Sequence, residues 1–292
     1  MRLARHPYLL LTLASFLWSA NFIVGRAVHG TVPPVALAFC RWAGASLLVL
    51  YPAWPHLRRD WPAIRRAWPS LLLLAAVGVA AFNTLIYTGL QTTQALNALL
   101  MQSTMPVIIV AMSFFLFRDG VSGRQALGIV LSLVGAATII LRGDPAALRT
   151  LTVNHGDLLV MIAVICYAAY SALLRLRPAI HPLSFVAVTF VAGTAMLVPF
   201  FIGEIHAGRT LAPNLPTFLA VGYVAIFPSV IAYLCFNRGV ELVGANRAGL
   251  FIHLMPVFGS LMAIVFLGEA FRWFHGTGIA LIAAGIYLAT RR

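Results

Sequence analysis

One stretch of this sequence occurs twice, and the duplication constrains the fold more than any other feature. Residues 95–141 align with residues 245–291 when the chain is shifted by 150 positions, so that Pro106 falls on Pro256. Each copy contains an apolar segment with an internal proline, an acidic turn, and a second apolar segment with small residues on one face. A period of this length indicates a duplicated half-protein rather than a solenoid.

The solvent of such a chain must be lipid. Hydrophobic residues make up 61% of the sequence and charged residues 9%, against about 45–50% and about 25% in soluble domains. A membrane-spanning helix needs about 20 mostly apolar residues, and ten segments meet this requirement. We predict spans at residues 8–28, 34–54, 69–90, 95–117, 124–141, 157–176, 182–202, 216–236, 245–266 and 271–290, with an arginine-rich loop at 56–68.

The duplication divides the chain into two five-helix halves. We predict a first repeat over residues 1–142, an outer linker over 143–156 and a second repeat over 157–292. Because each half has an odd number of spans, the two halves lie upside down relative to each other, as in many secondary transporters. The expected fold is therefore an all-α integral membrane protein, with ten transmembrane helices arranged as two inverted repeats around a central cavity.

The arginines predict the orientation of the chain. All 20 basic residues are arginines, and the formal net charge is +13. With the N-terminus inside, 14 arginines fall on the inner side and 5 on the outer side, with Arg41 left within a span. The positive-inside rule then places both termini in the cytoplasm. The arginines occupy separate short loops rather than one patch, so nucleic-acid binding is not expected.

The order of the motifs resembles the drug/metabolite transporter superfamily, specifically its EamA-type carriers with ten helices. The residues that carry this resemblance are Trp18-Ser19-x-Asn21-Phe22, Arg41, Pro106, Pro256, and the acidic turns at Asp119 and Glu269. The first acidic turn departs from the family pattern, because it reads Arg118-Asp119-Gly120 where the family usually has Gly-Glu. The second turn, Gly268-Glu269, follows the pattern.

The resemblance implies a function as well as a fold. It implies export of small metabolites through a central cavity by alternating access, across a bacterial inner membrane. Within the family the chain is most similar to exporters of aromatic amino acids, so neutral and aromatic amino acids are the expected substrates. A metabolite or nucleotide-sugar exchanger of the same superfamily is the alternative. We expect a monomer surrounded by membrane lipid, with an amino acid as its small-molecule partner and with no cofactor or metal.

Polar and aromatic side chains within the spans are the candidate site residues. Such groups are costly at membrane depth unless they face a cavity or a partner. Amides can bond the ammonium and carboxylate of an amino acid, while rings accept an apolar substituent. The candidates for the substrate cavity are Trp18, Asn21, Asn83, Tyr87, Gln102, Tyr167, Tyr170, Tyr233 and His253. The alternative is that these groups only join one helix to another.

Four further residues are candidates for structural or gating roles. Arg41 lies roughly 10 Å into its helix at 1.5 Å per residue, and we expect either an ion pair with Glu269 or contact with a substrate carboxylate. Pro106 and Pro256 are candidate hinges, the alternative being fixed kinks. His253 could carry a coupling proton or be a neutral core histidine.

Other functional classes are disfavoured. A membrane enzyme would need a nucleophile with its base, a carboxylate pair or a metal-binding motif, and the spans contain none of these. The sequence also lacks a phosphate-binding loop of the type GxxxxGK[ST], so nothing indicates ATP-driven transport. A receptor or scaffold with a closed helix bundle would lack a water-filled cavity, and this feature separates it from a transporter.

Overall fold

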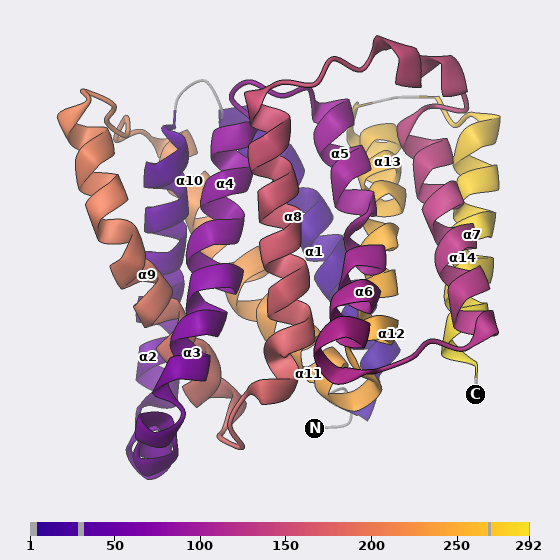
Figure 1. Cartoon of the computed structure of the whole chain (residues 1–292). Coiled ribbons are helices and arrows are strands. Elements are labelled where there is room, and N and C mark those ends of the chain that lie inside the picture. Colours follow the sequence, from indigo (N-terminus) through magenta and orange to yellow (C-terminus); the bar gives the residue numbers. More distant parts are fainter. Residues whose placement is uncertain (1–4, 29–31, 268–269, 292) are drawn as a thin grey trace.

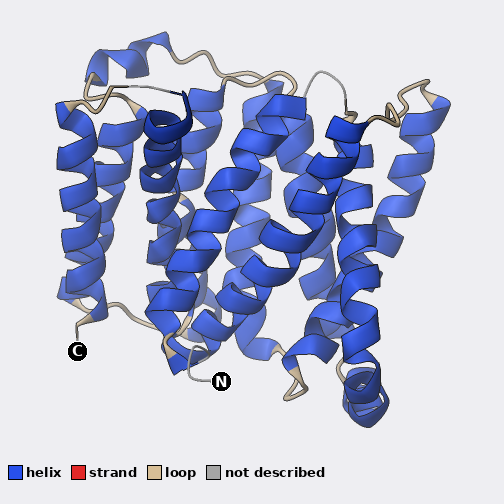
Figure 2. Ribbon diagram, turned by 180° about the vertical axis from the view of Figure 1, so that it is seen from behind, coloured by secondary structure: helices blue, strands red, loops and turns tan. Residues whose placement is uncertain are grey.

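The chain forms a bundle of long helices that run along one common direction (Figure 1). The computed structural model describes residues 5–28, 32–267 and 270–291, and this part of the chain contains helices and loops but no strand (Figure 2). The start of the first helix and the end of the last lie at the same end of the bundle. We refer to this end as the terminus end.

The first half contains five helical runs, two of which are interrupted. Its elements are α1 (Pro7–Val28), α2 (Pro34–Arg66), α3 (Trp68–Ala75), the π-helix η2 (Ala76–Ala81), α4 (Phe82–Gly89), α5 (Ala95–Ser103), α6 (Met105–Phe117) and α7 (Gly123–Ile140). A 3₁₀-helix, η3 (Pro145–Thr150), lies in the connection to the second half.

The second half repeats this order. Its elements are α8 (His155–Leu173), the 3₁₀-helix η4 (Leu174–Leu176), α9 (Pro182–His206), α10 (Leu215–Val224), the π-helix η5 (Ala225–Ile231), α11 (Ala232–Val243), α12 (Ala245–Leu250), the 3₁₀-helix η6 (Phe251–His253), α13 (Leu254–Leu267) and α14 (Trp273–Thr290). Among the described residues, nine helical runs are long and apolar enough to cross a membrane. Each of them coincides with a predicted span, and α1 is the remaining one. The predicted all-helical membrane fold is confirmed.

The predicted loop at residues 56–68 is wrong, because α2 continues to Arg66. The helix contains Pro52, Pro55 and Pro62, although each proline removes one backbone hydrogen bond from a helix. The helix persists because the segment has one face to pack. Ile64 is buried on that face, and the Asp60 carboxylate accepts a hydrogen bond from the backbone N–H of His181, at 2.9 Å. Its arginines face outward.

Helix packing shows that the two halves are related by a pseudo-two-fold axis. Equivalent helices of the two halves pack on each other, α2 on α9 and α7 on α14. The other contacts are reciprocal: α1 packs on α11 and α13, and α8 packs on α4 and α6. An exchange of this kind is expected when one half is rotated onto the other, and it places α1 and α8 at the centre of the bundle.

The contact between α7 and α14 has the same reciprocity at the level of single residues. Gly128 lies against the carbonyl of Gly285, and Gly135 lies against the carbonyl of Gly278. These pairs exchange under the 150-residue shift, and the residue numbers rise along one helix while they fall along the other. A Cβ at any of the four positions would collide with backbone of the facing helix. The glycines therefore allow the two helices to approach closely, as small residues do in membrane bundles.

The irregular segments also occur in equivalent places. The π-helices η2 and η5 interrupt the third run of each half. The fourth run of each half breaks just before its proline, at Thr104 ahead of Pro106 and at η6 ahead of Pro256. Because a proline lacks the N–H of a helical hydrogen bond, both prolines sit where the helix has already been interrupted.

Candidate functional site

A cluster of aromatic rings fills the middle of the bundle. It consists of Trp18 from α1, Tyr167 and Tyr170 from α8, and Tyr233 and Phe236 from α11, and we call it the aromatic cluster. The ring centroids of Trp18 and Tyr167 are 5.6 Å apart, those of Tyr167 and Tyr170 are 5.4 Å apart, and those of Tyr170 and Tyr233 are 5.8 Å apart. All five side chains are buried. Spacing of three residues on α8 and on α11 places each pair on one helix face.

The π-helices supply the backbone acceptors that hold this cluster. Trp18 Nε1 donates to the carbonyl of Pro228 in η5 at 3.0 Å, and the Tyr233 hydroxyl donates to the carbonyl of Gly78 in η2 at 2.5 Å. The two carbonyls are 150 positions apart and are thus equivalent. Irregular helical turns of this kind often occur at functional sites, and here both present a carbonyl to the same group of rings.

Arg41 lies beside the aromatic cluster and gathers three of the predicted site residues. Its guanidinium carbon lies 4.9 Å from the ring centroid of Trp42. The hydrogen bonds that it donates are to Ser229 Oγ (2.6 Å), Asn83 Oδ1 (2.9 Å), the Tyr87 hydroxyl (2.9 Å), the Pro228 carbonyl (3.2 Å) and Asn21 Oδ1 (3.3 Å). All five acceptors are neutral. Glu269, the acidic partner that we expected, lies outside the described residues.

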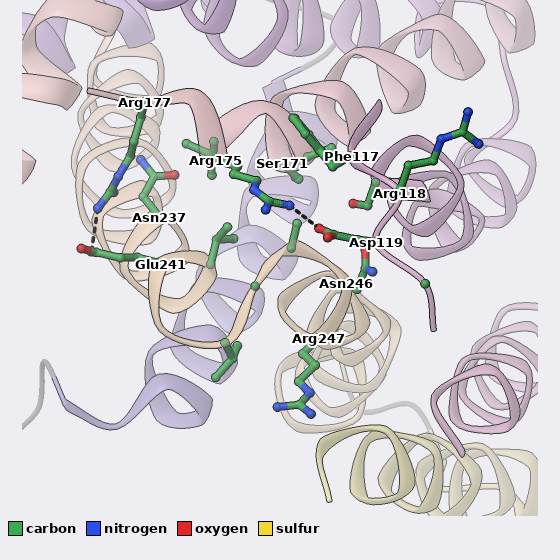
Figure 3. Close-up of a pocket in the computed structure, with 18 of the residues that line it drawn as sticks. Phe117, Arg118, Asp119, Ser171, Arg175, Arg177, Asn237, Glu241, Asn246 and Arg247 are labelled. Carbon is green, nitrogen blue, oxygen red and sulfur yellow. Dashed lines mark hydrogen bonds and ion pairs between the residues drawn. The ribbon is translucent and has the colours of Figure 1, made fainter. Parts of the chain in front are cut away.

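A cavity of about 820 Å³ opens at the terminus end of the bundle (Figure 3). Residues from the turn after α6, the end of α8 and the turn between α11 and α12 line it. Two ion pairs lie in its wall, between Arg175 and Asp119 and between Arg177 and Glu241, each at 2.7 Å (Figure 3). The lining also includes Arg118 and Arg247 (Figure 3), so cationic side chains outnumber carboxylates.

The aromatic cluster adjoins the wall of this cavity at Asn237. Ser171 and Asn237 line its inner part, and the hydroxyl of Tyr170 donates to Asn237 Oδ1 at 2.8 Å. Tyr170 in turn contacts Tyr167 and Tyr233 within the cluster. One buried hydrogen bond thus joins the cavity wall to the rings.

The structure places His253 in a different environment from the other candidates. Its Nε2 donates to the backbone carbonyl of Ser103, and its Nδ1 bonds the hydroxyl of Ser132, both at 2.8 Å. The imidazole therefore bridges η6 to α5 and α7 rather than joining the aromatic cluster. Gln102 is also buried, and its Nε2 has no hydrogen-bond partner within residues 5–28, 32–267 and 270–291.

Several residues of the site were missed by the sequence analysis. Phe236 is the fifth ring of the cluster, and its spacing of three from Tyr233 was an available signal. Ser229 looked like an ordinary small residue until the structure placed its hydroxyl on Arg41. The acidic turn at Asp119 was predicted, but its pairing with Arg175 joins segments 56 residues apart and has no local signal.

A helix bundle of this composition, with a polar interior and a cavity that opens at one end, is the architecture of a membrane transporter. The family model described as the EamA-like transporter family matches residues 6–141 and again residues 154–291. The chain therefore belongs to the EamA-like transporter family of the drug/metabolite transporter superfamily. Members of this family, including the relatives that this chain matches, are transporters and not enzymes.

Relatives and solved structures agree with this assignment. The uncharacterized transporter YyaM of Bacillus subtilis is 26% identical over 97% of this chain and 93% of its own length. An S-adenosylmethionine/S-adenosylhomocysteine transporter of Chlamydia trachomatis is 24% identical over 90% of this chain and 82% of its own length. One crystal structure matches with a TM-score of 0.80 at 21% identity, over 97% of this chain and 96% of the other, which shows the shared fold.

Proposed function

We propose that this transporter exports neutral amino acids with bulky apolar or aromatic side chains across a bacterial inner membrane. The observation that carries the proposal is the aromatic cluster beside the cavity, with Asn237 on one side and the groups around Arg41 next to it. Rings that pack edge to face in the protein offer the same faces and edges to an aromatic substrate. Asn237 and the groups around Arg41 provide hydrogen-bond partners for the ammonium and the carboxylate.

The direction of transport follows from the predicted orientation. The cavity opens at the terminus end, which the distribution of arginines places in the cytoplasm. The structure then corresponds to a state that takes up substrate from the cytoplasm. Because the halves are inverted, exchanging their conformations closes this cavity and opens an equivalent one on the other side. The bond between Tyr170 and Asn237 lies where the inner cavity and the cluster meet.

A second candidate substrate is an amino acid that carries a nucleoside. S-adenosylmethionine, named for the chlamydial relative, has an α-amino acid at one end and an adenine ring at the other. The aromatic cluster favours this candidate as well, since an adenine ring stacks on aromatic side chains. The cavity, at about 820 Å³, lies within the range of about 300–1,000 Å³ for small-molecule sites.

Counterflow into proteoliposomes loaded with one compound at a time tests these proposals. We would compare labelled phenylalanine, tryptophan, leucine, alanine and S-adenosylmethionine. Trp18→Leu removes a ring of the aromatic cluster, and Phe16→Leu is the matched control because Phe16 lies on the same helix with its side chain 41% exposed. An aromatic contact contributes about 0.5–1.5 kcal/mol beyond burial.

We expect Trp18→Leu to weaken phenylalanine transport by a few-fold to roughly tenfold relative to leucine transport, because only the aromatic substrate uses the ring contact. Phe16→Leu should leave the ratio unchanged. Equal loss for both substrates in Trp18→Leu, or the same change in both variants, would mean that the rings only pack helices. Counterflow of S-adenosylmethionine, without counterflow of any of the four amino acids, would favour the second candidate.

A further inference from the structure

Arg41 is a buried cation whose partners in the structure are all neutral. The residue is 1% exposed. Six of the seven acidic residues of the chain lie in the described part, and each of these carboxylates bonds a group other than Arg41. The pairs are Asp60 with His181 N, Asp119 with Arg175, Asp144 with Ala146 N, Asp157 with Thr93 and Asn97, Glu204 with Ala36 N, and Glu241 with Arg177 and Arg238.

The same region has more hydrogen-bond donors than acceptors. Asn83 turns its Oδ1 toward Arg41, which has no acceptor atom, and its Nδ2 is left buried with no partner among the residues that the structure describes. Trp42 Nε1 and the Tyr167 hydroxyl are buried in the same way. The ring of Tyr233 contacts both of these residues, with centroid distances of 5.2 Å to Trp42 and 6.1 Å to Tyr167.

A single kind of ligand group would satisfy both the uncompensated charge and the unused donors. Buried polar groups without partners are costly, and a buried cation without an anion is more so. What the region lacks is negative charge and acceptor atoms. A carboxylate brings both, because its two oxygens offer about four acceptor positions and match the fork of an arginine.

We propose that Arg41 is the anion-binding residue of the transport site and holds the carboxylate of the substrate, with Asn83 beside it. This inference rests on the proposed function in that it takes the substrate to be an amino acid. The aromatic cluster contacts Asn237 of the cavity wall through Tyr170, and it contacts Trp42, the neighbour of Arg41, through Tyr233. In this proposal the rings separate to admit the substrate and then surround its side chain. The excess of arginines in the cavity wall favours the approach of a molecule with an anionic end.

Two substitutions that remove the uncompensated positive charge in different ways test the role of Arg41. Arg41→Gln removes the cation, whereas Asn83→Asp supplies an anion within the protein that competes with the substrate carboxylate. We would measure half-saturation in counterflow for phenylalanine and for phenylalaninamide, which lacks the carboxylate. Glu269→Gln and Phe16→Leu serve as controls, and thermal unfolding of each purified variant reports on folding.

We expect the wild-type protein to prefer phenylalanine over its amide by at least roughly tenfold, as for hydrogen bonds to charged groups. Both Arg41→Gln and Asn83→Asp should reduce this preference to near unity by raising the half-saturation constant for phenylalanine and not that for the amide. Asn83→Asp should unfold at the same temperature as the wild type or higher, because the new carboxylate pairs with Arg41.

Other outcomes overturn the inference. If Asn83→Asp is stable and keeps the preference for the carboxylate, Arg41 is a structural residue. The same conclusion follows if Glu269→Gln loses the preference together with stability, because Glu269 would then be the partner of Arg41. If the wild type carries no amino acid, the proposed function fails separately. Stabilisation of the wild type by 3-phenylpropionate, absent in Asn83→Asp, would then still support an anion site at Arg41, and equal behaviour of the two proteins would refute it.

Discussion

The hydrogen bond between Tyr170 and Asn237 allows a direct test of the link between the aromatic cluster and the cavity wall. Tyr170→Phe removes one hydroxyl that donates to Asn237 Oδ1 at 2.8 Å, and the phenyl ring keeps its place in the cluster. A neutral buried hydrogen bond contributes about 0.5–1.5 kcal/mol. Asn237 lines the cavity, where water can replace the lost donor in part. We therefore expect Tyr170→Phe to lower the free energy of unfolding by about 1 kcal/mol, which is roughly a fivefold change in the unfolding equilibrium.

Tyr167→Phe is the matched control for this measurement. The two tyrosines lie on the same helix three residues apart, and both are at least nine-tenths buried. The Tyr167 hydroxyl, however, has no hydrogen-bond partner in the described part of the chain. Its removal loses no bond and relieves an unsatisfied group, so the free energy of unfolding should stay the same or rise.

Thermal unfolding of the purified proteins in detergent, without substrate, compares the two variants. Tyr170→Phe should unfold about 2 °C below the wild type, from the usual relation between stability and midpoint for a chain of this size. Tyr167→Phe should unfold at the wild-type temperature or above it. A lower midpoint for Tyr167→Phe with no change for Tyr170→Phe would refute the assignment of the bond. Equal midpoints for the two variants would refute it as well.

Three further predictions concern the scaffold and its orientation. Gly135→Leu should reduce the yield of folded protein, because a side chain there collides with α14 and overpacking costs about 1–3 kcal/mol. Gly222→Leu should be tolerated, since open space surrounds Gly222. Size-exclusion profiles of the purified variants distinguish the two outcomes. Asp157→Ala should lower the unfolding temperature, because it loses the capping box of α8 and the bonds from two neighbouring side chains, about 2 kcal/mol in total. Cysteines placed at Trp61 and Leu148 should be labelled by a membrane-impermeant reagent from the cytoplasmic and the outer side respectively, and the reverse pattern would contradict the orientation.

Much of the fold could be predicted from the sequence, because lipid imposes strong rules on composition and length. The apolar runs coincide with the helices, and the prolines repeated 150 positions apart indicated two equivalent halves. The error at residues 56–68 has a physical reason. An arginine-rich segment has no apolar run that predicts a helix, whereas here the helix continues because it packs Ile64 and binds the start of α9 through Asp60.

The site could be predicted only in part. Polar residues at membrane depth identified Asn21, Asn83 and Tyr87, and the structure brings them together around Arg41. An acidic partner was expected for Arg41 because a charge at that depth needs compensation. Glu269 lies outside the described residues, and the described acceptors around the guanidinium are neutral oxygens, one of them a carbonyl of the π-helix η5. No sequence pattern shows which turn of a helix becomes π-helical, so this acceptor could not be foreseen.

An experimental structure of the protein with bound phenylalanine tests the central claim most directly. We expect the phenyl ring of the bound phenylalanine to lie among Trp18, Tyr167 and Tyr233, and its carboxylate to lie within hydrogen-bond distance of the Arg41 guanidinium. The hydrogen bond between Tyr170 and Asn237 should be broken or displaced in that state. Phenylalanine bound elsewhere, with the aromatic cluster packed as it is here and Arg41 still bonded to its five neutral acceptors, would contradict the account.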